Sequence, residues 1–261
     1  MNPARPDGRP RTRRGTAIEL SWDMLSSAGG REANEDRCNF LALEQAACFV
    51  AADGLGGHGG GEIAAELAVD TVLRCFHESP DCSIQWLEES VQSANAAIIE
   101  RQSAERALAK MRSTAAVLVT DYESARWAHV GDSRVYHFRG GAVASQTSDH
   151  SVSQALADAG EITSEEIRFH EDRSRLRRCL GAQGQNRPTV LDVAVRLEPG
   201  DALLLCTDGF WEYVPESAML DALFDAAGPT AWLALMTACL KEKAGDGHDN
   251  YTAIALRVSA K

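Results

Sequence analysis

Four aspartates stand next to short apolar runs, where a strand would meet a loop. Asp53 and Asp208 each follow such a run and precede a glycine, Asp132 ends a third run, and Asp249 lies just before the last one. Strand ends that deliver carboxylates to neighbouring loops can form one shared acidic site. Oxygen ligands without cysteine or histidine favour Mg²⁺ or Mn²⁺ over Zn²⁺. The pattern therefore predicts a site for hard divalent cations.

Each of these aspartates has a simpler explanation when it is taken singly. Aspartate is common in turns, where its carboxylate bonds to the local backbone. The recurrence of an apolar run beside an aspartate is what favours a common site. Glycines directly after Asp53 support that interpretation, because they permit positive φ and let the backbone approach a ligand closely.

The elements that must position these residues follow from hydrophobic periodicity. Short apolar runs closed by turn residues predict strands, and apolar positions three and four residues apart predict helices. Two helix pairs are separated by groups of strands, which favours a layered antiparallel α+β sandwich over a doubly wound sheet. The predicted strands cover residues 18–25, 38–43, 46–52, 115–120, 125–130, 134–138, 142–145, 190–197, 202–206 and 251–258. The predicted helices cover residues 61–77, 83–111, 215–226 and 229–243.

The chain is expected to form one domain over residues 17–261, with two segments set apart from the core. Residues 1–16 are basic, rich in proline and poor in apolar groups, which predicts a disordered tail. Residues 147–188 are polar and rich in charge, and they indicate a flap-like insertion over the sheet edge. A solvated helical face would explain the same composition.

The composition of the chain limits the classes of binding partner and the cellular compartment that we expect. With 38 acidic against 26 basic residues the formal net charge is −12, which argues against nucleic acid as a general partner. No apolar run reaches the length of a membrane span, and the basic N-terminus lacks the apolar core of a signal peptide. The seven cysteines are scattered without a C-x-x-C pair, as in reduced cytosolic proteins. We therefore expect a cytoplasmic protein that binds neither nucleic acid nor membrane.

Five short motifs recur in an order that resembles one enzyme family. They are Arg31-x-x-Asn34-Glu35-Asp36, Asp53-Gly54-x-Gly56-Gly57-His58, Gly131-Asp132-Ser133-Arg134-x-Tyr136, Thr207-Asp208-Gly209-x-Trp211 and Asp249-Asn250. Each motif alone is weak, because Asp-Gly is a common turn, but five in order over one domain are strong evidence. The series resembles the metal-dependent Ser/Thr protein phosphatases of the 2C type, the PPM family, and most closely their compact bacterial members. The resemblance spans residues 21–258.

The resemblance implies a four-layer α-β-β-α sandwich, in which two antiparallel sheets are flanked by helix pairs. It also implies two Mn²⁺ or Mg²⁺ ions, with Asp53 bridging them and the carbonyl group of Gly54 on one of them. Asp208 and Asp249 would bind the other ion, and Asp36 would act through metal-bound water.

Four further residues receive roles from the resemblance. Arg31 would hold the substrate phosphate, because a planar guanidinium suits two-pronged contact with phosphate; an ordinary surface arginine is the alternative. Asp132 matches a position that contributes to a third, weaker metal site in bacterial members. Glu35 would assist through metal-bound water or simply be solvated, and Asn250 would orient Asp249 or cap the last strand.

These residues together imply a metal-dependent phosphoprotein phosphatase for phosphoserine and phosphothreonine, in which a hydroxide bridging two metals attacks phosphorus directly. A bacterial Ser/Thr protein kinase or its phosphorylated targets are the expected substrates, and a monomer is the expected state. Two alternatives stay open: a phosphatase of small phosphate esters on the same fold, and a catalytically silent phosphate-binding regulatory domain. Leu55 stands where many eukaryotic members have a histidine proposed as the general acid, so the leaving-group proton needs another source.

Overall fold

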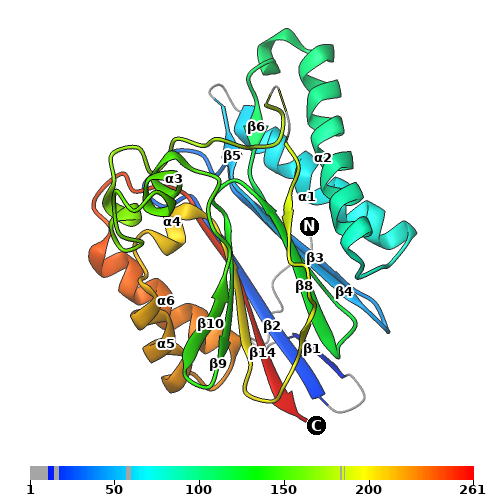
Figure 1. The fold of residues 1–261 in the computed structure, drawn as a ribbon, viewed down its shortest axis with the longest axis vertical. Coiled ribbons are helices and arrows are strands. Elements are labelled where there is room, and N and C mark those ends of the chain that lie inside the picture. The colour runs from blue at the N-terminus through cyan, green and yellow to red at the C-terminus, as the bar shows by residue number, and fades with distance from the viewer. Residues whose placement is uncertain (1–10, 15–17, 57–59, 183, 185) are drawn as a thin grey trace.

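Two antiparallel β-sheets packed face to face form the centre of the molecule (Figure 1). The computed structural model describes residues 11–14, 18–56, 60–182, 184 and 186–261. The first sheet has the strand order β1 (Arg11–Arg14), β2 (Ile18–Ser27), β14 (Tyr251–Ala260), β13 (Ala202–Cys206), β9 (Arg134–Arg139) and β10 (Ala142–Gln146). The second has the order β11 (Thr189–Val190), β8 (Ser124–Val130), β7 (Ala115–Thr120), β4 (Ala47–Ala52) and β3 (Arg37–Ala42), with β12 (Val195–Arg196) also paired to β8. A separate short ladder joins β5 (Gly54–Leu55) to β6 (Arg112–Ser113).

A pair of helices covers the outer face of each sheet (Figure 1). These helices are α1 (Gly60–Glu78) and α2 (Ile84–Ala104) on the second sheet, and α5 (Glu216–Asp225) and α6 (Pro229–Lys243) on the first. The structure therefore confirms the expected four-layer α-β-β-α sandwich. None of the helices in the described residues is both long and apolar enough to cross a membrane.

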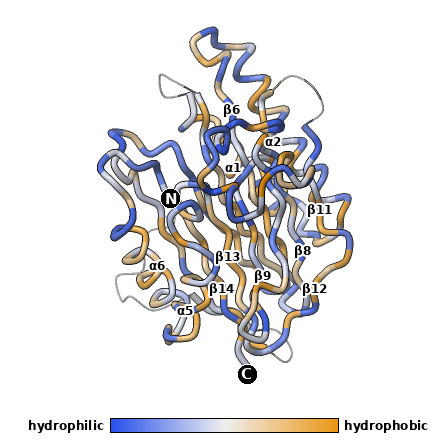
Figure 2. Tube along the Cα trace, turned by 60° about the vertical axis from the view of Figure 1, so that its left-hand side comes forward, coloured by the Kyte–Doolittle hydropathy of each residue, from blue (hydrophilic) through white to orange (hydrophobic). Residues whose placement is uncertain are grey.

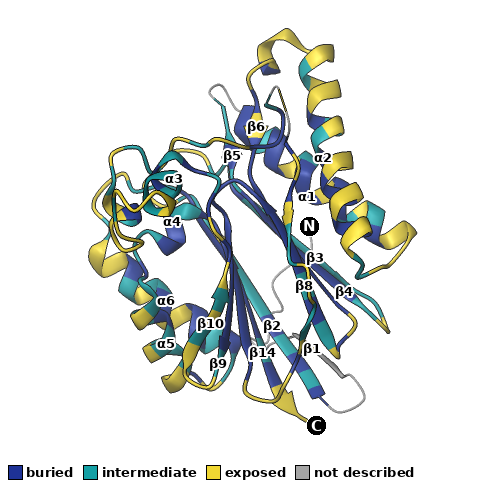
Figure 3. Cartoon of the chain, in the orientation of Figure 1, coloured by how far each residue is buried: buried dark blue, intermediate teal, exposed yellow. Residues whose placement is uncertain are grey.

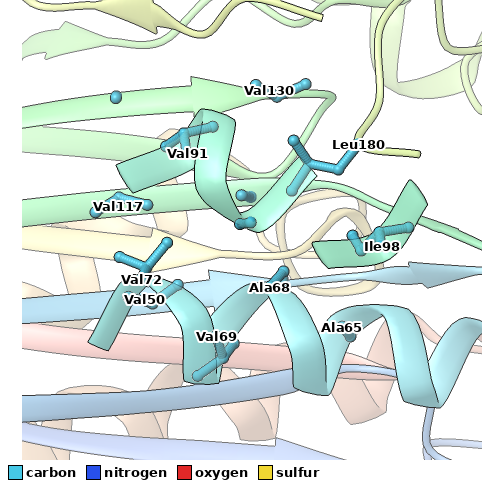
Figure 4. Packing of buried hydrophobic residues seen from close by; sticks show 14 of the residues in the cluster. Val50, Ala65, Ala68, Val69, Val72, Val91, Ile98, Val117, Val130 and Leu180 are labelled. Atoms are coloured by element: carbon cyan, nitrogen blue, oxygen red, sulfur yellow. The ribbon is translucent and has the colours of Figure 1, made fainter. Parts of the chain in front are cut away.

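Alternating side chains on the strands separate the layers. In β4, Cys48 and Val50 join the core beneath α1 and α2, whereas Phe49 and Ala51 join the core between the two sheets. The strands β13 and β14 are mostly hydrophobic in Figure 2, and Figure 3 shows the central strands buried. Figure 4 shows Val50 packed with residues of α1 and α2. This packing fixes the end of β4, from which Asp53 emerges.

The second helix is shorter than the expected span 83–111. It begins as predicted, because the hydroxyl group of Ser83 accepts a hydrogen bond from the N–H of Trp86 at 3.1 Å. It ends at Ala104, and a 3₁₀ turn η1 (Arg106–Leu108) follows. The side chain of Gln102 donates to the carbonyl oxygen of Met111 at 2.6 Å, so the chain folds back on the helix end. This reversal brings β6 beside β5, next to Asp53.

The expected strand at 190–197 is also wrong in part, because it is two short strands. β11 and β12 both pair with β8, and the residues between them bulge away from the sheet. Val193, in that bulge, is 78% exposed. An apolar run alone does not reveal such an interruption.

The expected disordered tail needs a correction at residues 11–14. Arg11–Arg14 form β1 and pair with Glu19–Trp22 at the edge of the first sheet. Backbone hydrogen bonds to an exposed strand edge need no apolar side chains, so composition did not predict this strand. Residues 1–10 and 15–17, and His58 of the glycine-rich turn, lie outside the described residues.

Deletion of residues 1–15 is expected to leave the hydrolysis of a small phosphate ester unchanged. β1 reaches along β2 only as far as Trp22, and the candidate site lies beyond the other end of β2. Six residues of extended chain separate Trp22 from Ala28, a distance of about 20 Å. Steady-state kinetics of the truncated protein would check this, and a large loss of kcat would show that the segment acts on the site.

The segment 147–188, which we call the flap, contains α3 (Val152–Asp158) and the 3₁₀ helix η2 (Glu166–Phe169). A bridge between Ser113 and Leu180 joins the flap to the rest of the domain, and a bridge between Ser151 and Leu176 joins two parts of the flap itself. A short helix, α4 (Asp208–Trp211), follows β13 and lies near α3 in Figure 1.

Candidate active site

A pocket of about 360 Å³ opens where the ends of both sheets meet the flap. Eight of the nine predicted site residues line it, and only Asp36 lies behind the surface. The lining consists of Arg31, Ala33, Glu35, Asp53, Gly54, Leu55, Gly56, Asp132, Ser174, Leu176, Asp208, Asp249 and Asn250. Residues far apart in sequence thus converge on one acidic pocket.

Asp53 is fixed through its backbone. Its N–H donates to the hydroxyl oxygen of Thr114 at 2.9 Å, and its carbonyl oxygen accepts from the N–H of Thr114 at 2.8 Å and the hydroxyl of Ser113 at 2.9 Å. The hydroxyl oxygens of Thr114 and Ser133 are 2.6 Å apart, which ties this turn to the one that carries Asp132. The carboxyl group of Asp53 faces the pocket and the carboxyl group of Asp36. Sequence reasoning missed both hydroxyl groups, because serine and threonine beside a strand carry no distinctive signal.

Gly54 is a glycine because the start of α1 packs directly against it. A Cβ atom at this position would lie 2.0 Å from the carbonyl oxygen of Gly61. No side chain fits there, so the residue after Asp53 must be glycine for α1 to approach the pocket.

Asp36 is buried and held from the opposite sheet. The hydroxyl of Thr207 donates to Oδ2 of Asp36 at 2.7 Å and accepts from the N–H of Thr252 at 3.0 Å. Its other carboxylate oxygen, Oδ1, is buried without a hydrogen-bond partner. Thr207 therefore links Asp36 to Asp208, the next residue in the chain and the first of α4.

Asn250 holds the loop that carries Arg31. Its side-chain amide donates to the carbonyl oxygens of Ala28 and Ala33, each at 2.8 Å, and its Oδ1 accepts from the N–H of Glu35 at 2.8 Å. The backbone N–H of Asn250 also donates to Oδ1 of Asp249 at 2.9 Å, in line with the expected orientation of Asp249, and the side-chain contacts add a role in shaping this loop.

Arg31 reaches the pocket as an exposed cation. Its Nη2 atom lies 3.2 Å from Oδ2 of Asp249, and the two side chains are 54% and 49% exposed. A guanidinium at the mouth of an acidic pocket can meet the phosphate of an incoming substrate. An exposed ion pair of this kind is weak, so Arg31 is free to exchange partners.

The turn at Asp132 rests on a buried aromatic and ionic stack. The indole N–H of Trp211 donates to the carbonyl oxygen of Asp132 at 2.9 Å, and the guanidinium of Arg134 lies 3.4 Å from the centre of a Trp211 ring. Arg134 forms two hydrogen bonds of 2.8 Å with Asp149. Asp149 is thus a buried ion-pair partner. Oδ1 of Asp132 is buried without a partner.

The carboxyl groups of Asp36 and Asp132 hold their protons more tightly than an aspartate in water does. Burial raises the pKa of Asp36 to about 6, against hydrogen bonds from Thr207 and Thr252. Burial, and then the charge of Asp149, raises the pKa of Asp132 to about 8. Both effects disfavour the charged form of a carboxyl group.

The pKa values of two further carboxyl groups, those of Asp53 and Asp208, are raised for the same reasons. Burial raises the pKa of Asp53 and of Asp208 well above the usual range, and the neighbouring carboxylates add to it. Both side chains keep part of their surface open to the pocket, so water solvates them more than burial alone suggests. Burial and the charge of Asp249 also raise the pKa of Glu35.

The residues present fit divalent cations. Crowded carboxylates with raised pKa values, and buried Oδ1 atoms of Asp36 and Asp132 without partners, mark positions where positive charge would be stabilised. Within the described part of the chain, no three potential ligand side chains already converge tightly enough to hold an ion. Arg31 holds Asp249, and the N–H of Gly209 donates to Oδ1 of Asp208 at 2.7 Å, so these side chains must turn when a cation binds.

Ser174 and Leu176 of the flap complete the pocket on one side. Ser174 lies in a turn, and Leu176 forms a β-bridge with Ser151. The N–H of the next residue, Arg177, donates to the carbonyl oxygen of His150 at 2.7 Å. The sequence indicated a flap but not which of its residues reach the pocket, because the segment has no periodic pattern.

Comparison with known proteins points to one family. A family model described as protein phosphatase 2C matches residues 27–248. A serine/threonine phosphatase named stp from Listeria welshimeri is 32% identical over 199 residues, which are 74% of this chain and 78% of that protein. The serine/threonine protein phosphatase PstP of Mycobacterium tuberculosis is 31% identical over 242 residues, which are 92% of this chain but 45% of PstP.

Comparison with solved structures points to the same family. The catalytic domain of a phosphatase named PstP, in complex with two manganese ions, has a TM-score of 0.79 and 28% identity, covering 94% of this chain and 100% of that one. The phosphatase Stp1 from Staphylococcus aureus has a TM-score of 0.81 and 26% identity, covering 91% of this chain and 94% of the other.

Proposed function

Because this chain belongs to the protein phosphatase 2C family, we propose that its acidic pocket removes phosphate from phosphoserine and phosphothreonine in proteins, with the help of divalent cations. The observation that carries this proposal is the convergence of Asp53, Asp132, Asp208 and Asp249 with Arg31 on one pocket. A silent phosphate-binding domain would not need to keep four carboxylates together at one pocket, and three of them, those of Asp53, Asp132 and Asp208, have raised pKa values.

Mn²⁺ or Mg²⁺ is the cofactor that this oxygen-rich pocket suits. We assign two ions to Asp53, Asp208, Asp249 and the carbonyl group of Gly54, with Asp36 behind Asp53, and a third, weaker ion to Asp132 with Asp208. When bound, such ions lower the pKa of a water molecule and neutralise charge on the phosphoryl group.

The protein's own residues bind and orient the substrate. Arg31 would exchange Asp249 for the substrate phosphate, since its planar fork matches two phosphate oxygens. Asn250 keeps the loop of Arg31 and Glu35 against the pocket. Leu176 and Leu55 close two sides of the pocket with apolar surface, which limits the water around the reacting group.

A comparison of substrates tests the proposal. Phosphoserine and phosphothreonine peptides should be hydrolysed with Mn²⁺ and left intact after addition of a chelator, with a larger kcat/KM than p-nitrophenyl phosphate. Faster turnover of small esters than of every phosphopeptide would favour the small-ester alternative. Binding of phosphopeptides without any turnover in Mn²⁺ would favour the silent domain.

We propose a phosphorylated Ser/Thr protein kinase or the targets of such a kinase as the natural substrates, acted on by a monomer in the cytoplasm. The bacterial relatives named as serine/threonine phosphatases support the substrate class. All seven cysteines are free thiols, which supports a reducing compartment. Size-exclusion chromatography with light scattering would test the monomer.

Asp132→Ala is expected to lower kcat and kcat/KM together, by roughly 10- to 100-fold, and to raise the Mn²⁺ concentration needed for half-maximal rate. The substitution removes a weak-ion ligand while Asp53, Asp208 and Asp249 keep the tighter ions. The indole N–H of Trp211 donates to the backbone carbonyl oxygen of Asp132, which the substitution leaves in place, so folding should survive. Calorimetric Mn²⁺ titration and kinetics would check it. A wild-type kcat with unchanged Mn²⁺ dependence would rule out the ion at this position.

A further inference from the structure

Two arginines of the flap hold the short helix α4, which begins with Asp208. Nε of Arg173 donates to Oε1 of Glu212 at 2.8 Å. Arg168 donates through Nη1 to the carbonyl oxygen of Trp211, the last residue of α4. The flap is thus tied to the helix on which a candidate cation ligand stands.

Glu212 lies on the same face of this helical turn as Asp208. Its N–H donates to the carbonyl oxygen of Asp208 at 2.9 Å, and residues four apart on a helix share a face. The side chain of Glu212 is only 12% exposed, and Arg173 is its one ion-pair partner among the described residues. The Glu212 carboxylate contributes to the raised pKa of both Asp208 and Asp132, which shows that its charge reaches both.

We propose that the Arg173–Glu212 ion pair sets the affinity of the pocket for its most weakly held cation, at Asp132 and Asp208. With Arg173 in place the two charges cancel, and a cation meets less negative potential. When the flap carries Arg173 away, Glu212 is unpaired and attracts the cation more strongly. Arg173 and Glu212 are positioning residues, because neither needs to touch the substrate. The inference rests on the proposed metal-dependent function.

The ion pair is placed so that it can open without unfolding the domain. Arg173 is 37% exposed and lines a cavity of about 390 Å³ outside the active pocket, together with Lys243 and Phe169. Phe169, on the rim of the same cavity, is 79% exposed. Solvent thus reaches the pair from the side of Arg173, so the guanidinium can leave Glu212 into water without crossing packed side chains of this cavity.

Calorimetric Mn²⁺ titration of the intact protein without substrate tests the proposal. Arg173→Gln should tighten the weakest Mn²⁺ site roughly three- to tenfold, and Glu212→Gln should loosen it by a similar factor, because each leaves one charge uncancelled. The double variant restores neutrality and should bind Mn²⁺ as the wild type does. Arg173→Lys keeps the charge and should also resemble the wild type.

Arg175→Gln is the matched control. Arg175 lies two residues away, and its guanidinium is exposed and pairs with Asp172 inside the flap. An equal shift with Arg175→Gln would overturn the inference in favour of a general charge effect. Weaker or unchanged Mn²⁺ binding by Arg173→Gln would also overturn it. If the wild type neither binds Mn²⁺ nor hydrolyses phosphopeptides, the proposed function itself fails; if it does both and the variants do not differ, only this inference fails.

Discussion

Asp53→Asn is expected to abolish turnover while the protein stays folded. Four other carboxyl groups, those of Asp36, Asp132, Asp208 and Asp249, act on the carboxyl group of Asp53. Loss of a ligand of the tightly held ions should cost more than the roughly 10- to 100-fold expected for Asp132, the ligand of the weaker ion. The fold should persist, because Thr114 and Ser113 bind the backbone of Asp53 and not its side chain. Kinetics in saturating Mn²⁺, with circular dichroism, would measure both.

The metal-free Asp53→Asn protein should also be at least as stable as the metal-free wild type. The amide removes a charge that burial and four neighbouring carboxyl groups disfavour. Asp70→Asn is the matched control, because it makes the same change on an exposed position of α1 and should alter neither turnover nor stability. Near-wild-type kcat for Asp53→Asn in saturating Mn²⁺ would show that the ligand assignment is wrong.

The sequence predicted the convergence of the aspartates on one pocket because these residues lie at strand ends. The apolar runs before Asp53 and Asp208 became β4 and β13, and the register of the buried strands then left no freedom in where their last residues point. A strand that is buried on both faces is readable from hydrophobicity alone. That is why one pattern predicted both the sheets and the carboxylates.

What the sequence did not predict are contacts between segments distant in the chain. Asn250 clamps a loop more than 200 residues earlier, and Glu212 pairs with Arg173 of the flap. Neither contact leaves a periodic pattern, because each depends on how loops fold over the finished sandwich. The pairing of β1 with β2 is of the same kind, since it uses backbone groups that every sequence carries.

The metal-free protein is expected to lose stability as the pH rises from about 6.5 to 8. The pKa of Asp132 is about 8 in the folded state, against about 3.8 when unfolded, so in this window the folded state binds a proton that the unfolded state has released. Stability falls with rising pH wherever the folded state binds more protons. Each carboxyl group that keeps its proton through the window contributes a loss of about 2 kcal/mol.

Most of the effect of the histidines on stability falls below the window from pH 6.5 to 8. Burial lowers the pKa of His150 to about 3 and those of His129 and His137 in the same direction, so their contribution to stability grows with pH up to the unfolded pKa of about 6.5. Above that pH each histidine adds only about 0.4 kcal/mol more, against a loss of about 2 kcal/mol for each carboxyl group that keeps its proton. Chemical denaturation at pH 6.5, 7.2 and 8 would measure the decline, and Asp132→Asn should flatten it. With Mn²⁺ present, stability should instead rise with pH over this range. The cation replaces the proton and binds better as the carboxyl groups ionise. A metal-free stability that is flat or rising from pH 6.5 to 8 would mean that these carboxyl groups are already ionised in the folded protein, and that the pocket tolerates their charge without a cation.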